Sequence, residues 1–178
     1  MRLPSRPDAA RAGVAAYIGL GSNLERPAAQ VQRAFTELSA LPETRLVARS
    51  RLYRSRPLGP PNQPDYINAV AALQTWLQPL SLLRALRAIE RQHGRRRETD
   101  LHWGPRTLDL DMLVYGDATL HTPELILPHP GVHERSFVLY PLAEVAPTLV
   151  IPGHGPVWLL RDRCRSPAIE MCKETPDE

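Results

Sequence analysis

The chain has 178 residues, 43% of them hydrophobic and 23% charged, which is enough to bury the core of one soluble domain. Its formal net charge of +3 is too small to indicate a nucleic-acid-binding protein, and no apolar run approaches the ~20 residues of a membrane-spanning helix. The two cysteines, Cys164 and Cys172, are too few for a disulfide framework, so we expect free thiols in a cytoplasmic protein.

The first predicted elements are a strand, a helix and a second strand. Val14–Leu20 is a short apolar run typical of a buried strand, and the G-x-G pattern at Gly19–Gly21 predicts a tight turn into the helix. Ser22 or Asn23 can cap this helix. Its apolar residues recur at helical spacing: Leu24, Ala28, Val31, Phe35 and Leu38. Residues 45–53 are predicted to form the second strand.

A segment rich in proline and glycine, residues 55–65, leads into a third strand and a second helix. Its composition predicts an irregular loop. Residues 66–77 form the predicted strand, whose residues 66–73 alternate between two faces. One face carries Tyr66, Asn68 and Val70, and the other carries Ile67, Ala69, Ala71 and Leu73. Residues 80–93 have the pattern of an amphipathic helix, and the glycine that follows suits its C-terminal end.

The second half of the chain completes the predicted order of elements. Residues 95–102 are polar and charged and predict a mobile loop, whereas residues 107–115 predict a strand. Residues 119–130 are mostly extended or loop. Residues 137–142 predict a further strand, with a short helix starting within residues 142–146. The alternation of strands and helices predicts an α+β, ferredoxin-like sandwich, an antiparallel sheet with helices packed on it.

The predicted domain occupies residues 14–160, between two polar ends. Residues 1–13 contain arginines without a following apolar stretch, which predicts a disordered extension rather than a secretory signal. A transit peptide is the alternative for this arginine-rich start. Residues 161–178 are charged and predict a loose tail.

The strongest chemical signal is the run Trp103-Gly-Pro-Arg-Thr-Leu-Asp-Leu-Asp111. Asp109 and Asp111 are two residues apart, so on a strand their carboxylates project from the same face. Two adjacent carboxylates repel each other, and a divalent cation removes that repulsion. Mg²⁺ is typically held by a few carboxylates together with phosphate oxygens and water. A solvated acidic face is the alternative reading of this pair.

Arginines close to this pair favour a phosphate site over a solvated face. Five arginines lie between Arg91 and Arg106, and guanidinium groups suit phosphate oxygens. Carboxylates that hold metal and arginines that hold phosphate together indicate a nucleotide polyphosphate site. The chain lacks the G-x-x-x-x-G-K-[ST] pattern, so it is not a P-loop enzyme.

Two further groups of residues are candidates for substrate binding. Tyr66 and Asn68 offer an aromatic face and an amide on one strand face, which suits a flat heterocycle, although a half-buried core role is the simpler alternative. His129 and His133 have a spacing found in zinc sites, but no third ligand stands at a recognisable spacing. His129 and Arg135 fit better as side chains that donate hydrogen bonds to phosphate oxygens. Phe137 is a candidate for the wall of the site opposite Tyr66, or an ordinary core residue.

Taken together, these segments resemble the 6-hydroxymethyl-7,8-dihydropterin pyrophosphokinase family of folate biosynthesis. The resemblance runs from about Val14 to Ile151. Besides the run that ends at Asp111, the matching segments are Tyr17–Leu24, Pro57–Pro60 through Asn68, Glu90 with Gly94-Arg95, and Pro128-His129 through Phe137. The resemblance implies a ferredoxin-like fold and transfer of pyrophosphate from ATP to the pterin hydroxymethyl oxygen, with AMP leaving.

The resemblance also implies a role for each matching residue. Asp109 and Asp111 would bind two Mg²⁺ ions, and these two with Arg95 and Arg97 would be the catalytic residues. The nucleotide side would comprise Glu90, Arg95, Trp103, Arg106, His129 and Arg135. The pterin ring would stack between Tyr66 and Phe137 and bind to Asn68 and to backbone groups of Ser55 and Leu58. The loops at residues 55–65 and 95–102 would close over the ligands. A monomer with small-molecule substrates, and no nucleic-acid or membrane partner, is implied as well.

The chain departs from the family pattern at a few positions. Pro130 stands where some relatives have tyrosine, and Arg56 where some have proline. The loop at residues 95–102 is one residue longer than in some relatives, so the role of Arg97 is less secure than that of Arg95. An RNA-binding ferredoxin-like domain is one alternative function. An ATP- and Mg²⁺-dependent enzyme that transfers a nucleotidyl or single phosphoryl group is another.

Overall fold

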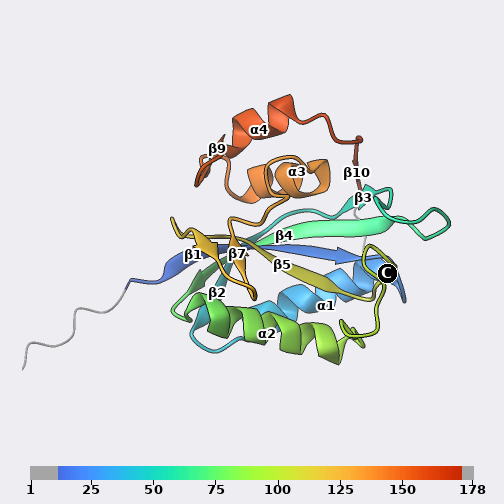
Figure 1. The fold of residues 1–178 in the computed structure, drawn as a ribbon, viewed down its shortest axis with the longest axis horizontal. Helices are drawn as coiled ribbons and strands as arrows, with labels where there is room; N and C mark the ends of the chain where they lie inside the picture. Colours follow the sequence, from blue (N-terminus) through green and yellow to red (C-terminus); the bar gives the residue numbers. More distant parts are fainter. Residues whose placement is uncertain (1–11, 174–178) are drawn as a thin grey trace, which may run out of the picture.

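The computed structural model describes residues 12–173, which form a six-stranded antiparallel sheet with helices on both faces (Figure 1). The strands follow the order β10-β3-β4-β1-β5, and β2 also pairs with β4. Their bounds are β1 Val14–Ser22, β2 Thr44–Arg49, β3 Tyr53–Ser55, β4 Tyr66–Thr75, β5 Asp109–Tyr115 and β10 Glu170–Met171. Residues 1–11, most of the predicted N-terminal extension, lie outside the described residues.

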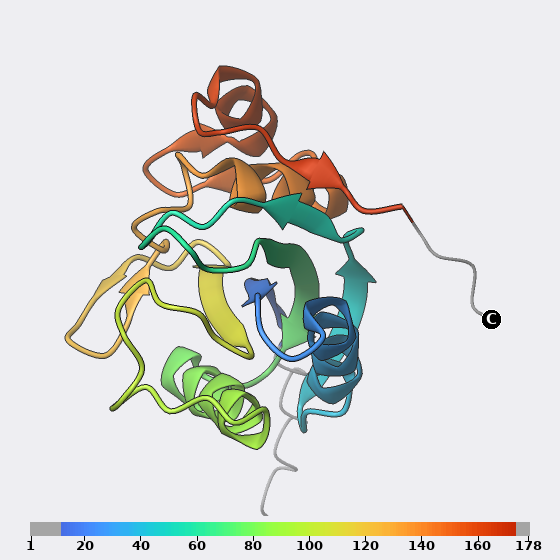
Figure 2. The ribbon, with the colours of Figure 1, turned by 90° about the vertical axis from the view of Figure 1, so that its right-hand side faces the viewer.

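The helices form two layers, one on each side of the sheet. Figure 2 views the sheet nearly end-on, with α1 (Pro27–Ser39) and α2 (Pro79–Gln92) on one side. On the other side lie α3 (Ser136–Val145) and α4 (Val157–Arg163). Two short hairpins complete the fold: β6 (Leu120–His121) with β7 (Ile126–Leu127), and β8 (Val150–Ile151) with β9 (Gly155–Pro156).

The connectivity of the central elements confirms the predicted ferredoxin-like fold. In chain order they are β1, α1, β2, β4, α2 and β5, and across the sheet β5 lies beside β1, β1 beside β4, and β4 beside β2. This is the split βαβ arrangement, in which each helix returns the chain so that both helices cover the same face. The layer formed by α3 and α4 is an addition on the opposite face.

Residue alternation along the strands separates two hydrophobic cores. The larger core lies between the sheet and α1 and α2, and it takes alternate strand residues such as Ile18 on β1, Ala69 on β4 and Leu110 on β5. The smaller core lies under α3 and contains Val70 and Leu113 from the sheet. The two faces of residues 66–73 are therefore as predicted.

Residues 137–142 form part of helix α3, so the prediction of a strand there is wrong. The buried residues of this segment include Val138, Leu139, Leu142 and Ala143, a helical spacing that packs one side of α3 onto β4. A short apolar run does not distinguish a buried strand from a buried helix, and Pro141 within it disfavours both. The RNA-binding alternative needs an open sheet face, whereas α3 lies across β4 on this face.

Three smaller predictions also differ from the structure. The strand predicted at residues 45–53 is divided into β2 and β3, because the backbone N–H of Ser50 donates to Val70 O and its hydroxyl accepts from the Val70 N–H. Gly19 and Gly21 lie inside β1 rather than in a turn. The described part of the predicted loose tail is paired: β10 bonds to β3, and the Cys172 N–H donates to Leu52 O at 2.8 Å.

Candidate active site

The face of the sheet under α3 carries an open cleft. Its walls come from β1, β4, β5, the N-terminal turn of α3 and the loops after β3, α2 and β7. Eleven residues predicted to bind substrates or metal line it: Ser55, Leu58, Tyr66, Asn68, Trp103, Arg106, Asp109, Asp111, His129, Arg135 and Phe137. Residues that are far apart in sequence therefore meet in one place.

The floor of this cleft is the backbone of β1 at its two glycines. Gly21 pairs with Asn68 on one side and Asp109 on the other, and Gly19 pairs with Asp111. A Cβ placed on Gly21 would meet its nearest protein atoms, Asn68 Oδ1 and Tyr66 Cδ1, at 3.5 and 3.8 Å, which is ordinary contact. Packing of the protein itself therefore does not require glycine here, and the missing side chain leaves room above the sheet for a ligand.

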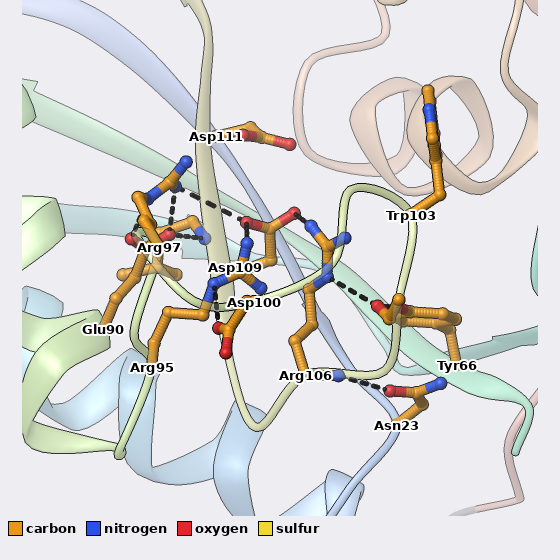
Figure 3. Close-up of polar contacts among 12 residues, drawn as sticks. Asn23, Tyr66, Glu90, Arg95, Arg97, Asp100, Trp103, Arg106, Asp109 and Asp111 are labelled. Atoms are coloured by element: carbon orange, nitrogen blue, oxygen red, sulfur yellow. Dashed lines mark hydrogen bonds and ion pairs between the residues drawn. The ribbon is translucent and has the colours of Figure 1, made fainter. Parts of the chain in front are cut away.

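Asp109 lies between arginines on both sides (Figure 3). Arg106 Nη1 donates to Asp109 Oδ2 at 3.0 Å, and Arg97 Nη2 and Arg95 Nη2 approach Asp109 Oδ1 at 3.5 and 3.8 Å. Asp111 has no arginine within ion-pair distance among residues 12–173, and its nearest cation-forming partner is His129 Nε2 at 3.9 Å. Among the described residues, three guanidinium groups thus surround Asp109, and none of them pairs with Asp111.

Buried Glu90 on α2 holds the arginine side of the site in place. Its carboxylate accepts hydrogen bonds from Arg97 Nε and Nη2 at 2.8 and 2.6 Å and from the backbone N–H of Leu110 at 2.8 Å. Only 1% of Glu90 is exposed, so the bidentate pair stands in a poorly solvated environment. The pKa of Arg97 is raised, chiefly by this hydrogen bond, so its charge is secure.

Arg95 is buried at the start of the loop that follows α2. Its Nε lies 3.1 Å from Asp100 Oδ2, within ion-pair distance, but the angle does not form a hydrogen bond, and Nε and Nη1 have no hydrogen-bond partner among the described residues. Gly94 precedes it with φ +83°, the left-handed conformation that ends α2 as predicted. A buried guanidinium with unused donors is suited to receive an anion.

The pKa of the Asp111 carboxyl is raised to about 7. Burial contributes most, followed by the negative charges of Asp109 and Glu90. Because 39% of the Asp111 side chain still faces the cleft, water reduces the contribution of burial, and we give the like-charge repulsion more weight. A divalent cation can offset the repulsion between two carboxylates on one strand face.

The residues predicted to hold the pterin lie on the other side of the cleft. Asn68 is 5% exposed, and its amide donates to Ser55 Oγ at 2.8 Å, which fixes its orientation toward β3. The Tyr66 hydroxyl donates to Gly104 O at 2.9 Å, so the ring is tied to the loop that carries Trp103. Burial raises the pKa of Tyr66, which keeps its hydroxyl protonated.

The guanidinium group of Arg135 lies over the aromatic rings of both Trp103 and Phe137. The Arg135 guanidinium lies 5.1 Å from the Trp103 ring centre and 6.0 Å from that of Phe137. Trp103 itself is 41% exposed and adopts φ +63°, which is uncommon for a bulky residue. In Figure 3 its ring points away from Arg95, Arg97 and Arg106. Gly59 approaches the Trp103 backbone so closely that an added Cβ would lie 2.2 Å from Trp103 O.

A second cleft adjoins the first and shares Asp111 and His129 with it. One part of its wall is apolar, formed by Leu83, Leu110, Met112, Pro123, Leu125, Ile126 and Pro130. The polar part is formed by Arg87, Arg97, Glu124 and the two shared residues. The pair of clefts therefore offers two binding regions that meet at Asp111. Arg97 lines the second cleft. Glu90 and Arg95 line neither cleft: Glu90 accepts hydrogen bonds from Arg97, and Arg95 approaches Asp109.

The structure places one important residue that the sequence reading assigned to another role. Asn23 is 2% exposed and does not cap α1, whose N-cap is Arg26 without a side-chain cap bond. Its amide donates to Gln63 Oε1 and Pro64 O, and its Oδ1 accepts from the Arg106 N–H. Asn23 thus joins the loop after β3 to the segment before β5. The sign of this role in the sequence is an asparagine placed directly after an apolar strand.

The possible zinc pair is not formed. His133 stacks on His154 with ring centres 4.1 Å apart, whereas His129 faces Asp111. Within residues 12–173, no group of three or more His, Cys, Asp or Glu side chains is placed to hold a metal ion unaided. A cation at Asp109 and Asp111 therefore needs further oxygen ligands from a substrate or water. No helix in the same range is long and apolar enough for a membrane crossing.

Comparison with protein sequences gives a consistent family. Residues 17–147 match the family described as 7,8-dihydro-6-hydroxymethylpterin-pyrophosphokinase. A Pseudomonas aeruginosa 2-amino-4-hydroxy-6-hydroxymethyldihydropteridine pyrophosphokinase is 57% identical over 136 residues, 76% of this chain and 83% of that protein. The Haemophilus influenzae protein of the same name is 49% identical over 140 residues, 79% of this chain and 86% of that protein.

Solved structures agree on the fold. The chain aligns with a Plasmodium falciparum HPPK-DHPS structure with pteroate at a TM-score of 0.66 and 14% identity, over 84% of this chain and 42% of that one. A second HPPK-DHPS structure, in complex with substrates, aligns at a TM-score of 0.65 and 10% identity over 85% of this chain and 43% of that one.

Proposed function

This chain belongs to the 7,8-dihydro-6-hydroxymethylpterin-pyrophosphokinase family, and we propose that its Asp109 and Asp111 hold the two Mg²⁺ ions of the family's reaction. The enzyme transfers pyrophosphate from ATP to the hydroxymethyl group of 6-hydroxymethyl-7,8-dihydropterin, a step of folate biosynthesis. ATP is the co-substrate, and loss of its terminal pyrophosphoryl group leaves AMP. The number of ions and the role of each residue are our proposals.

The observation that carries the metal assignment is the isolated carboxylate. Asp111 stands beside Asp109 on one face of β5, without an arginine of its own, and its pKa is raised to about 7. A divalent cation between the two groups would cancel this repulsion. When bound, Mg²⁺ would neutralise charge on the phosphate oxygens and orient them for displacement.

We place the pterin in the first cleft and ATP in the second. The first cleft has Tyr66 and Phe137 in its walls and the fixed amide of Asn68 beside its glycine floor, which suits a flat, polar heterocycle. The second has an apolar part suited to a nucleobase and a polar part suited to phosphates. Because the clefts share Asp111 and His129, the pterin hydroxymethyl oxygen and the β-phosphorus would meet at the carboxylates.

The chain's own residues would supply positioning and positive charge. Arg95, Arg97 and Arg106 converge on Asp109, so phosphate oxygens bound there would face three guanidinium groups. Glu90 fixes Arg97 from behind, and His129 and Arg135 extend the cationic wall toward α3. Asp109 or Asp111 would accept the proton of the attacking hydroxyl, since no other carboxylate lines the first cleft.

The product of turnover tests the proposed reaction most simply. The purified protein is incubated with ATP, Mg²⁺ and 6-hydroxymethyl-7,8-dihydropterin, and the nucleotide released is identified by chromatography. AMP formed in equal amount to the pyrophosphorylated pterin is the expected result. ADP would indicate single phosphoryl transfer, and free pyrophosphate would indicate nucleotidyl transfer; either would contradict the proposal. Omission of the pterin provides the control for background ATP hydrolysis.

The remaining assignments rest on the family resemblance. We propose that residues 14–160 form a single pyrophosphokinase domain, onto which the end of α4 and strand β10 also pack, and that it acts as a cytoplasmic monomer with small-molecule substrates only. Cys164 and Cys172 are both free thiols, in agreement with a reducing compartment. Light scattering of the purified protein at micromolar concentration is expected to give the mass of one chain, and a dimer mass would contradict the monomer assignment.

A further inference from the structure

Arg87 on α2 is a half-buried arginine that the proposed function has not used. It lines the second cleft, and its Nε is buried without a hydrogen-bond partner. Among residues 12–173 its side chain makes no ion pair, in contrast to Arg95, Arg97 and Arg106, which all approach carboxylates. A buried guanidinium donor left unpaired costs free energy, and an anion entering the cleft would offset that cost.

The position of Arg87 along α2 indicates which part of a nucleotide it would meet. Leu83, Arg87 and Glu90 follow one another at helical spacing on one side of α2. Leu83 belongs to the apolar part of the second cleft, and Glu90 binds Arg97 beside Asp109. Arg87 therefore lies between the region suited to the base and the region suited to the β- and γ-phosphates.

Two groups of ATP lie between its base and its β-phosphate: the ribose and the α-phosphate. A ribose hydroxyl carries no charge, and a neutral polar side chain is enough to bind it. A half-buried guanidinium without a carboxylate partner instead matches an anionic oxygen pair, which it can bind in a bidentate manner. Glu124 is the acidic residue in this cleft apart from Asp111, and it is exposed and outside ion-pair distance of Arg87.

We propose that Arg87 binds the α-phosphate of ATP, the phosphate that remains on AMP when pyrophosphate is transferred. Arg87 would then hold the leaving group in the second cleft during the reaction and retain AMP afterwards. This inference rests on the proposed function, because it assumes that the second cleft receives the nucleotide. It adds a contact for the departing phosphate, distinct from the arginines around Asp109.

Comparison of AMP with adenosine tests this contact, because the two molecules differ only by the α-phosphate. Binding is measured by calorimetry in EDTA, so that no metal contributes, for the wild type and for the Arg87→Gln, Arg87→Lys and Arg84→Gln variants. Arg84 is exposed on the same helix and lines neither cleft, so it is the matched control for loss of one charge. Thermal unfolding of each variant checks that the fold is retained.

We expect Arg87→Gln to weaken AMP binding about tenfold while adenosine binding changes less than twofold. Arg87→Lys should recover part of the AMP affinity, and Arg84→Gln should behave like the wild type. Equal weakening of AMP and adenosine would overturn the proposal in favour of a ribose or base contact, and unchanged AMP binding would overturn it outright. A wild-type protein that binds neither molecule would contradict the nucleotide placement itself, and the inference with it.

Discussion

The two faces of the sheet formed by β1, β4 and β5 carry different kinds of residues. Toward α1 and α2, alternate residues such as Ile18 and Ala71 are apolar and fully buried, and they line neither cleft. Toward α3, the residues between them include Gly21, Asn68, Asp109 and Asp111, which line the first cleft. Neighbouring residues on one strand thus serve the core and the site separately, because strand side chains alternate between the two faces.

The carboxylate pair of the site is built on a strand of the sheet, β5, rather than on a loop. The carboxylates project from a central antiparallel sheet whose opposite face is packed core, so their spacing is set by the strand. The arginines, in contrast, lie in the loop after α2 and before β5, and they are held by Glu90, Asp100 and Asp109. Substitutions on the cleft face should reduce activity, and those on the core face should reduce stability.

The largest expected effect is on the carboxylate pair. Asp111→Ala should lower kcat by about a thousandfold or more, because it removes a proposed metal ligand. It should leave the melting temperature nearly unchanged or slightly higher at neutral pH, since it relieves repulsion from Asp109 and Glu90. Steady-state kinetics and calorimetry check both parts. Turnover within a factor of ten of the wild type would mean that Asp111 does not hold the metal.

Leu108→Ala is the matched change on the core face, one residue before Asp109. Leu108 is fully buried in the larger core and lines neither cleft, so its truncation should destabilise the fold by about 2–5 kcal/mol. Denaturant unfolding measures this loss, and kcat per folded molecule should stay within a few-fold of the wild type. A variant of normal stability but strongly reduced kcat would show that the two faces are not separate in function.

Gly21→Ala tests the glycine floor and should have an intermediate effect. The added methyl group meets protein atoms only at ordinary contact distances, so stability should be retained. It would occupy the floor of the first cleft beside Asn68, so the KM for the pterin should rise about tenfold while the KM for ATP stays within twofold. An increase in the ATP KM instead would place the nucleotide over this glycine.

The smallest expected effect is the loss of folding stability at low pH that comes from Glu144 on α3, which accepts a hydrogen bond from Tyr53 on β3. Burial alone would raise the pKa of Glu144, but hydrogen bonds from Tyr53 and Arg51 outweigh it and lower this pKa. Because the folded-state pKa lies below the unfolded one, the contribution to stability is present above about pH 4.5 and is lost as the pH falls through the folded-state pKa.

Glu144→Gln should therefore lower the melting temperature by about 2–4 °C at pH 7 and by progressively less below pH 4.5. Melting curves of both proteins between pH 3 and pH 7 measure the difference. A difference that stayed constant across this range would mean that ionisation of Glu144 is not its source.

The sequence was sufficient for the features that follow from alternation and spacing. The facing carboxylates and the opposite faces of residues 66–73 follow from the two-residue period of strands. The first part of helix α3, residues 137–142, is predicted wrongly as a strand because its apolar run is too short to separate strand from helix and contains Pro141. The support of Arg97 by Glu90 and of two loops by Asn23 depends on long-range contacts, which spacing along the chain does not reveal.

A crystal structure with Mg²⁺, a non-hydrolysable ATP analogue and the pterin tests the central claim most directly. We predict two cations between the phosphate oxygens and the carboxylates of Asp109 and Asp111, with the analogue in the second cleft and the pterin over Gly21. A ternary complex in which Asp109 and Asp111 face separate environments, with no cation between them and the phosphates, would contradict the account.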